Sequence, residues 1–300
     1  MIRSLLRNAR GVVTMLLIAV NTVFWCTSVF VIAVFKLLVP LRSWRVLTSR
    51  WLMFIGERWV RSNQLIFGLT QNIHWDVRGV EDLQYHEWYL VVSNHRSWVD
   101  ILVLQGVFTR RIPFLKFFIK QRLIWLPLLG LTWWAMDMPF MKRFSRQYLE
   151  KNPHMRGKDL EATRRACEKF ATTPTSVINF VEGSRFTAEK RRQKNSPYQH
   201  LLPARAGGIA FVLGAMGGTL HSLLDVTIVY AEGSPSIWDL CTGRVSHIVV
   251  DVCHQPIEPW LAAGNYQDDE VFRARFQQWL GEFWQRKDER IDEIRRELES

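Results

Sequence analysis

The sequence predicts an α/β fold, a central sheet flanked by helices, preceded by a helical segment that crosses or lies in a membrane. Three observations support this prediction. From about residue 72, short β-rich runs alternate with stretches of helical periodicity, a pattern typical of α/β layers. The runs are almost continuously apolar, as in strands buried on both faces. The residues before 72 differ in composition and contain one long apolar stretch without charge.

The first helix is predicted over about residues 11–39. Gly11 to Phe35 contains no charged residue, and at ~1.5 Å per residue such a helix can cross a hydrocarbon core of ~30 Å. The stretch is too long for the core of a signal peptide, and Pro40 ends the helix. Basic residues flank both ends, so they do not fix the orientation. A helix that enters the membrane and returns stays an open alternative.

A second helix is predicted over about residues 41–69. Large apolar side chains recur there at helical spacing while the arginines lie largely on the other sides: Trp44, Leu47, Trp51, Ile55 and Trp59. This pattern favours an amphipathic helix in the headgroup region. A helix packed on the following domain is the alternative. Residues 1–71 are therefore predicted to anchor the chain to a membrane, and residues 72–300 to form the catalytic domain.

Four runs are predicted to be strands of the sheet: Trp88 to Ser93, Ser176 to Val181, Asp225 to Tyr230 and His247 to Val252. A helix is expected between them, over Lys158 to Ala171. The tail from Phe272 to Glu299 alternates in charge sign and is predicted to be a solvated amphipathic helix.

Another apolar stretch, Leu123 to Phe140, is interrupted by proline, glycine and aspartate. We expect buried or interfacial protein there instead of a membrane span.

Composition narrows the class of ligand. The net charge is +11, with 14 tryptophans in 300 residues. Such a basic chain binds nucleic acid, anionic lipid headgroups or a phosphorylated small molecule. Basic residues form no dense block interleaved with aromatics, and no nucleic-acid-binding motif occurs, so we expect no nucleic-acid partner. Tryptophan suits boundaries between dry and wet surroundings, which favours a membrane.

The first chemical motif follows a predicted strand directly and runs from Asn94 to Asp100. A helix is expected to begin here, with Ser93 or Asn94 as its cap. Asp100 lies five residues beyond His95, slightly more than one helical turn, so its carboxylate can reach one ring nitrogen. The other ring nitrogen then faces a substrate hydroxyl. His95 is therefore predicted to act as general base and Asp100 to orient it.

The second motif follows another predicted strand and reads Glu182-Gly183-Ser184-Arg185. Glycine permits a tight turn and a close approach of backbone to ligand. The guanidinium of Arg185 can hold a phosphate through two parallel hydrogen bonds. Because the ends of strands in α/β sheets are where sites are usually built, the two motifs are expected to share one site.

The combination of these motifs resembles the glycerolipid acyltransferase family, which includes 1-acylglycerol-3-phosphate acyltransferases. Lys120 to Gly130, followed by Phe140 to Arg143, looks like the second block of that family. Leu202 to Gly208 looks like the fourth block. The four blocks occur in family order. Ser184 stands where the family motif has threonine, which keeps the hydroxyl and removes a methyl group.

Finer details resemble the lysocardiolipin-acyltransferase-like branch. They are Phe186-Thr187, the run from Asp225 to Tyr230, and Lys287-Asp288 in the tail.

The resemblance implies a glycerolipid-acyltransferase-like central sheet and a fatty acyl transfer to the free hydroxyl of a lysophospholipid. Lysophosphatidic acid is the expected acceptor, and other lysophospholipid headgroups stay open. The donor would be acyl-CoA or acyl carrier protein, with no cofactor, and no residue spacing suggests a metal. The implied substrate-binding residues are Asn94, Glu182, Gly183, Ser184, Arg185, Lys120, Arg143, Pro203 and Arg205.

Two other classes of protein stay open. A thioesterase could use the same His–Asp pair with water, but it would have no use for a phosphate clamp. A membrane scaffold without activity would not need His95, Asp100 and Arg185 together. The expected partners are membrane phospholipid, lysophospholipid and the acyl donor. The chain shows no ER-retention ending, so we expect a bacterial inner membrane, with the site facing the cytoplasm.

Overall fold

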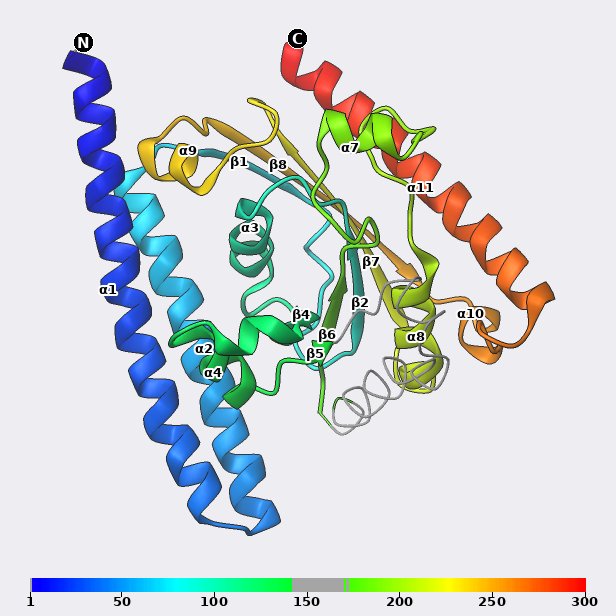
Figure 1. Cartoon of the computed structure of the whole chain (residues 1–300), viewed down its shortest axis with the longest axis horizontal. Helices are drawn as coiled ribbons and strands as arrows, with labels where there is room; N and C mark the ends of the chain where they lie inside the picture. Colours follow the sequence, from blue (N-terminus) through cyan, green and yellow to red (C-terminus); the bar gives the residue numbers. More distant parts are fainter. Residues whose placement is uncertain (1, 142–169, 171–172) are drawn as a thin grey trace.

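The computed structural model describes residues 2–141, 170 and 173–300, and it confirms the α/β architecture (Figure 1). Its main sheet has six strands in the order β1-β8-β7-β2-β6-β3, all parallel to their neighbours except the antiparallel pair β7–β8. A two-stranded sheet pairs β4 with β5. The strands are β1 (His74–Arg78), β2 (Tyr89–Ser93), β3 (Leu115–Phe117), β4 (Ile119–Lys120), β5 (Phe140–Met141), β6 (Ser176–Asn179), β7 (Ser222–Tyr230) and β8 (His247–Pro256).

All four predicted strands are present, as β2, β6, β7 and β8. The sequence did not reveal β1 or β3. The first, β1, is a partly exposed edge strand of five residues and carries polar side chains, and β3 has only three residues. Neither has the apolar run that marks a strand covered on both faces.

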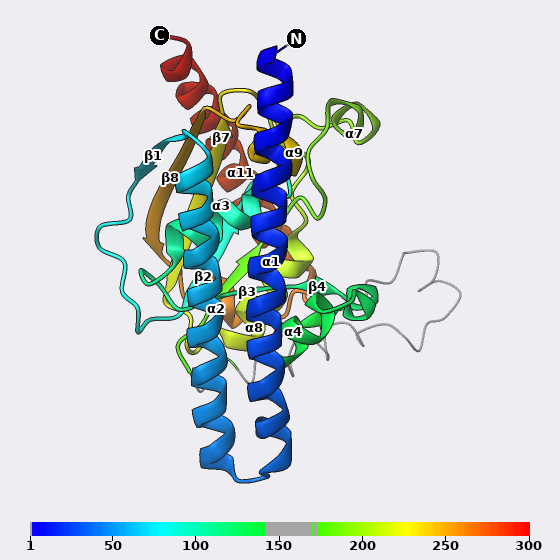
Figure 2. The ribbon, with the colours of Figure 1, turned by 90° about the vertical axis from the view of Figure 1, so that its left-hand side faces the viewer.

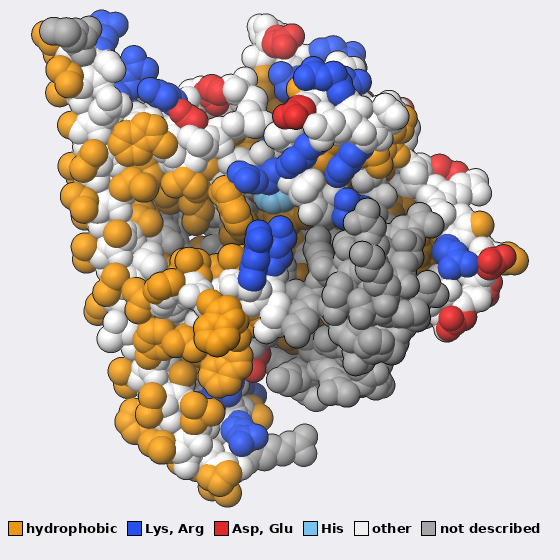
Figure 3. Space-filling model, viewed as in Figure 1, with side chains coloured by type: hydrophobic (Ala, Val, Ile, Leu, Met, Phe, Trp, Pro, Cys, Tyr) orange, Lys and Arg blue, Asp and Glu red, His pale blue; other side chains and the backbone are white. Residues whose placement is uncertain are grey.

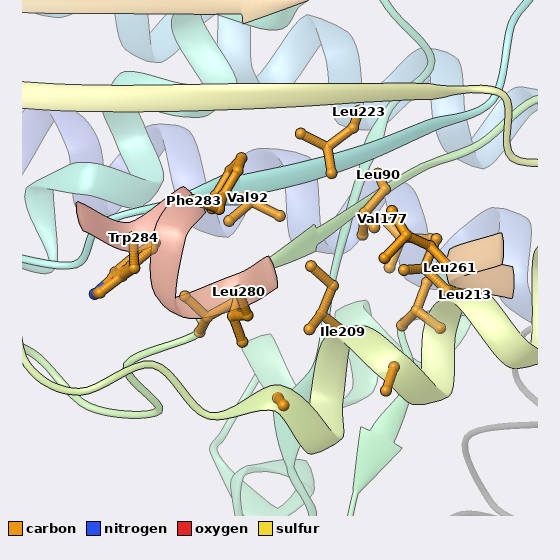
Figure 4. Close-up of a cluster of buried hydrophobic side chains, with 14 of the residues drawn as sticks. Leu90, Val92, Val177, Ile209, Leu213, Leu223, Leu261, Leu280, Phe283 and Trp284 are labelled. Atoms are coloured by element: carbon orange, nitrogen blue, oxygen red, sulfur yellow. The ribbon is translucent and has the colours of Figure 1, made fainter. Parts of the chain in front are cut away.

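Side chains on opposite faces of each central strand enter two different hydrophobic clusters. On β2, Leu90 and Val92 face α8 (Ala206–Met216) and α11 (Glu270–Glu299), as Figure 4 shows. Tyr89 and Val91 of the same strand enter the cluster with α3 (Val99–Phe108) and α9 (Ile237–Thr242). Because successive side chains of a strand alternate between faces, burial of both faces requires the continuous apolar runs seen in the sequence.

The C-terminal helix α11 is not the solvated helix that its charges suggested. Its apolar stripe packs on the sheet, and its buried side chains include Phe276, Leu280, Phe283 and Trp284. Lys287 and Asp288 are buried as well. The alternating charges lie on the outer side, so the pattern described only the solvent-facing half of the helix.

The first two helices, α1 (Ile2–Leu38) and α2 (Arg42–Thr70), form a long hairpin whose tip projects away from the sheet (Figures 1 and 2). The N-terminal part of α1 and the C-terminal end of α2 both lie against α9. The guanidinium of Arg10 donates to the carbonyl of Thr242 at 2.6 Å, and the amide of Gln71 donates to Thr14 Oγ1 at 3.0 Å and to the carbonyl of Cys241 at 2.8 Å. The chain therefore enters and leaves the hairpin at the same end.

Both predicted helices are present, but α2 packs along α1 and is not an isolated surface helix. Near their midpoints, Trp25 Nε1 donates to Ser62 Oγ at 2.8 Å, and Asn21 Nδ2 donates to Asn63 Oδ1 at 2.8 Å. Within the described residues, α1 is the one helix long and apolar enough to cross a membrane, and only 17% of its most apolar window is buried.

The apolar stretch after residue 123 forms short elements and no span. They are η1 (Gln121–Trp125), α4 (Leu129–Ala135) and β5. Trp125 is 86% exposed, and Leu131 and Trp134 are also exposed. An ion pair of 2.9 Å between Lys36 and Asp137 ties this segment to the hairpin. The expectation that this stretch is not a membrane span is confirmed for its described residues, because none of its elements is long enough to cross a membrane. The helix expected over Lys158 to Ala171 lies outside the described residues, apart from Phe170.

Candidate active site

The loop after β2 brings His95 and Asp100 into contact. His95 Nδ1 lies 2.8 Å from Asp100 Oδ2, and Asp100 is fully buried whereas the His95 side chain is 13% exposed. The same carboxylate oxygen accepts the backbone N–H groups of Arg96 at 2.6 Å and Ser97 at 2.9 Å. The carboxylate oxygen is the acceptor in all three contacts, so a neutral imidazole carries its proton on Nδ1. His95 Nε2 is then the nitrogen with a free lone pair.

Tyr230 supplies the remaining bond to Asp100. Its hydroxyl donates to Asp100 Oδ1 at 2.7 Å from the end of β7. Burial, with the neighbouring negative charge of Asp100, raises the pKa of Tyr230 well above its ordinary value, so the phenol stays a donor. The sequence analysis missed this contact. The position of Tyr230 at a strand end was the one available signal, because residues 100 and 230 meet only in the folded sheet.

Asn94 does not cap α3, and the expected cap is wrong. Its side-chain amide donates to the carbonyl of Ile228 at 2.9 Å and accepts the N–H of Ile228 at 2.9 Å. The residue at the cap position of α3 is Trp98, without a side-chain cap bond. Asn94 is buried and locks the loop that carries His95 onto β7.

Glu182 joins three loops. Its carboxylate accepts the N–H of His95 at 2.8 Å and the N–H of Leu202 at 3.0 Å. Burial raises the pKa of Glu182 to about 7, although these two N–H groups act in the opposite direction. Gly183 follows with φ +66°, a conformation that glycine adopts without strain.

A further bond runs from the N–H of Phe186 to the carbonyl of His95 at 2.7 Å. The Phe180 ring stacks on the imidazole at 4.1 Å between centroids. The loops after β2 and β6 and the loop before α8 therefore meet around His95, at the edge where these parallel strands end.

Cationic side chains surround this edge, as the space-filling view shows around a recessed histidine (Figure 3). Arg185 is exposed, and its guanidinium lies 5.1 Å from the centre of the Trp98 ring. Lys190 Nζ donates to the carbonyl of Arg185 at 2.9 Å, and Lys194 Nζ lies 3.5 Å from Ser184 Oγ. Burial first, and then the charge of Arg205, lowers the pKa of Lys194. Lys194 is on α7 (Ala188–Gln193) as its C-cap and was not foreseen.

The other predicted substrate-binding residues have fewer contacts in the candidate active site. Arg205 is exposed, and its N–H donates to the carbonyl of Val181 at 2.8 Å. Pro203 is half-buried in the same loop, and Lys120 is exposed on β4. Arg143 lies outside the described residues.

Lys116, a basic residue just before the second block, is not a ligand-binding candidate. Lys116 is buried and donates to the carbonyl of Met136 at 2.5 Å, so it does not face a ligand.

Two segments resembled the lysocardiolipin-acyltransferase-like branch: the run from Asp225 to Tyr230 and the pair Lys287-Asp288. They contact one another or the candidate active site. Lys287 Nζ donates to the carbonyl of Val226 at 2.7 Å and pairs with Asp225. Asp288 accepts the N–H groups of Gln199 at 2.7 Å and His200 at 2.8 Å. Helix α11 thus fixes both β7 and the loop that leads to Pro203.

Known proteins resemble this chain in sequence and in fold. A family model described as Acyltransferase matches residues 74–230, just over half of the chain. The chain is 29% identical to 1-acyl-sn-glycerol-3-phosphate acyltransferase gamma of Mus musculus over 217 residues, covering 67% of this chain and 52% of the relative. It is 26% identical to the delta protein of Homo sapiens over 212 residues, covering 66% and 51%. The chain spans about half the length of these relatives.

A solved structure shares the fold. The 1-acyl-sn-glycerophosphate (LPA) acyltransferase PlsC from Thermotoga maritima superposes with a TM-score of 0.54 at 16% identity. The match covers 92% of this chain and 97% of that one, so it includes the N-terminal helices as well as the sheet.

Proposed function

The chain belongs to the acyltransferase family, and we propose that it moves a fatty acyl group from a thioester donor to the free hydroxyl of a lysophospholipid. The observation that carries the proposal is the braced pair of His95 and Asp100 beside a cluster of cationic side chains. A general base and a phosphate-binding group are the two requirements for acylating the hydroxyl of a lysophospholipid. The favoured acceptor is 1-acyl-sn-glycerol-3-phosphate, and the donor is acyl-CoA or acyl carrier protein.

The acceptor binds through its phosphate. Arg185 is exposed at the edge of the site, and Lys194 and Arg205 lie on the same side. A guanidinium can offer two parallel N–H bonds to phosphate, and the ammonium of Lys194 adds a point charge. The clamp holds the free hydroxyl of the acceptor near His95, which replaces a bimolecular encounter by an oriented one.

His95 then moves one proton twice. Nε2 takes the hydroxyl proton while the oxygen attacks the thioester carbonyl carbon, and a tetrahedral intermediate forms. When the carbon–sulfur bond breaks, the imidazolium returns that proton to the leaving thiolate, so charge and protons balance. Asp100 stabilises the imidazolium between the two transfers, and no nucleophile of the protein is consumed.

The hairpin supplies the expected membrane contact. Apolar side chains are exposed along both helices, with Val34, Leu38, Leu47 and Trp51 near the tip. A bacterial inner membrane with the site facing the cytoplasm is the location we propose, as the sequence suggested. A lysophospholipid whose tail stays in that membrane would present its phosphate and hydroxyl at the protein surface.

Other acceptors remain alternatives to lysophosphatidic acid: lysophosphatidylglycerol, lysophosphatidylinositol and lysocardiolipin. Lys287 and Asp288 resemble the lysocardiolipin-acyltransferase-like branch, but both are buried against β7 or the loop before α8, so these contacts do not select among headgroups.

The test is acyl transfer from radiolabelled oleoyl-CoA, by the full chain in detergent micelles, to a panel of lysophospholipids. We expect label in a diacyl product, fastest with lysophosphatidic acid, and its loss in His95→Ala. Free fatty acid formed without any acceptor would identify a thioesterase. If no donor, including acyl carrier protein, gave turnover, the chain would be a scaffold and the proposal would fail.

A further inference from the structure

A cleft opens at the end of α3 that lies away from the candidate active site. It has a volume of about 390 Å³ and lies between α2, the loop before β2 and the turn after α3. Its lining includes Phe54, Arg58, Arg61, Tyr85 and Arg110. Because α3 has ten residues, its ends lie ~15 Å apart at ~1.5 Å per residue, so this cleft is separate from His95.

The cleft carries an excess of positive charge. Three arginines line it against one carboxylate, Glu57, which accepts the hydroxyl of Tyr85. In the part of the chain that the structure describes, Arg58, Arg61 and Arg110 form no ion pair with a carboxylate. Three cations around one cleft repel each other, and a bound anion would remove that repulsion.

The surroundings of the cleft favour an anion that carries a tail. Phe54 lines the cleft and is 47% exposed, and the guanidinium of Arg58 lies 4.7 Å from the centre of its ring. One turn nearer the tip of the hairpin, Trp51 packs edge-on against Phe54 and is also exposed. Leu47 continues this apolar surface along α2, which runs beside α1 to the tip (Figure 2). A free anion would gain nothing from these side chains, whereas an acyl chain would bury them.

We propose that this cleft binds the phosphodiester headgroup of an anionic membrane phospholipid, whose acyl chains lie along the apolar side of α2. The three guanidiniums would hold the phosphate, and Phe54 and Trp51 would contact the upper part of the chains. The site is distinct from the acceptor site, and the proposal does not depend on acyl transfer. Its role is to hold the catalytic domain against anionic regions of the membrane.

The experiment measures binding of tail-labelled phosphatidylglycerol to the full chain in detergent micelles, by energy transfer from the tryptophans. Tail-labelled phosphatidylcholine is the neutral comparison. The test variant is Arg58→Gln with Arg61→Gln and Arg110→Gln. The matched control removes three exposed arginines of α11, in Arg275→Gln with Arg286→Gln and Arg296→Gln. A third variant puts lysine at all three positions of the cleft.

We expect the glutamine variant of the cleft to bind phosphatidylglycerol at least about tenfold more weakly, because it loses three cationic side chains that attract an anionic headgroup. Its binding of phosphatidylcholine should weaken much less, because the choline cation cancels the charge of the phosphate, and the α11 control should not lose affinity for phosphatidylglycerol. Without lipid, the melting temperature of the cleft variant should equal or exceed that of the wild type, which also shows that it folds.

Three results would overturn the proposal. An equal loss of affinity for phosphatidylglycerol in the α11 control would show that only general surface charge matters. Undiminished binding of phosphatidylglycerol by the lysine variant would show the same. Displacement of labelled lipid by inorganic phosphate as readily as by unlabelled phosphatidylglycerol would make the cleft a site for free phosphate.

Discussion

Two groups of residues in the candidate active site differ in how they are held. The inner group consists of His95, Asp100, Glu182 and Tyr230, which are buried or nearly so and joined by hydrogen bonds of 2.7 to 2.8 Å. The outer group consists of Arg185, Lys194 and Arg205, which are more exposed and have few partners. The inner group is therefore organised before any substrate arrives, whereas the outer group can adapt to a headgroup.

The difference separates two tasks. A proton transfer needs a base whose orientation is fixed to a fraction of an ångström, which burial and several bonds provide. Recognition of a phosphate needs charge and donors, which exposed arginine and lysine side chains supply, and the planar guanidinium loses less rotamer entropy per hydrogen bond that it forms. Changes in the inner group should therefore lower kcat, and changes in the outer group should raise KM for phosphate-bearing acceptors.

The largest effect is expected for His95→Ala. Loss of the base should lower kcat by about 10²–10⁴-fold, the range typical of general-base catalysis. Because His95 and Asp100 act as one unit, the double variant with Asp100→Ala should be no slower than His95→Ala alone. Steady-state kinetics with oleoyl-CoA measures both. Additive losses would show that Asp100 has a task independent of the histidine.

Arg185→Gln should chiefly affect binding. Loss of charged hydrogen bonds worth about 1.5–3 kcal/mol predicts a KM for lysophosphatidic acid raised by about 10–100-fold, with kcat changed little. Monoacylglycerol, which lacks the phosphate, should be used equally by both proteins. Arg192→Gln, an exposed arginine on α7, is the matched control. An equal loss for both acceptors would make Arg185 a structural residue.

Glu182→Gln should change how stability depends on pH. Since the pKa of Glu182 is raised to about 7 in the folded protein, the folded state holds a proton that the unfolded state releases above its pKa of 4.5. The free energy of unfolding contributed by Glu182 therefore falls as pH rises from about 4.5 to 7, by at most about 1.4 kcal/mol per pH unit.

Glutamine does not titrate, so the difference in unfolding free energy between wild type and Glu182→Gln should vary across this window and level off above it. Urea unfolding at several pH values measures that difference. A difference independent of pH would mean that Glu182 is ionised throughout, held by the two N–H groups that it accepts.

The smallest effect is expected for Tyr230→Phe. One hydrogen bond of about 0.5–1.5 kcal/mol is lost, which predicts a kcat lower by about two- to tenfold. Without this donor the charge of Asp100 is less well compensated and stabilises the imidazolium more strongly, so the acidic limb of the pH–rate profile should move to higher pH. A purely structural contribution of Tyr230 would lower kcat without moving this limb.

The sequence by itself determined whatever depends on neighbours along the chain. Residues 11–35 predicted a long apolar helix because they lack charge, and the continuous runs of β2, β6, β7 and β8 predicted buried strands. The spacing of His95 and Asp100 predicted their contact, because five residues around a loop and helix start leave little freedom. The family resemblance added the loops that carry Glu182 and Pro203.

Tertiary structure decided the contacts between distant segments. Tyr230 reaches Asp100 across 130 positions, and Lys287 reaches Val226 across 61. The same holds for the burial of α11 and for the return of α2 along α1. The physical reason is that such contacts depend on the register of strands and the packing of helices, which follow from the summed burial of many side chains and not from the pattern of any one segment.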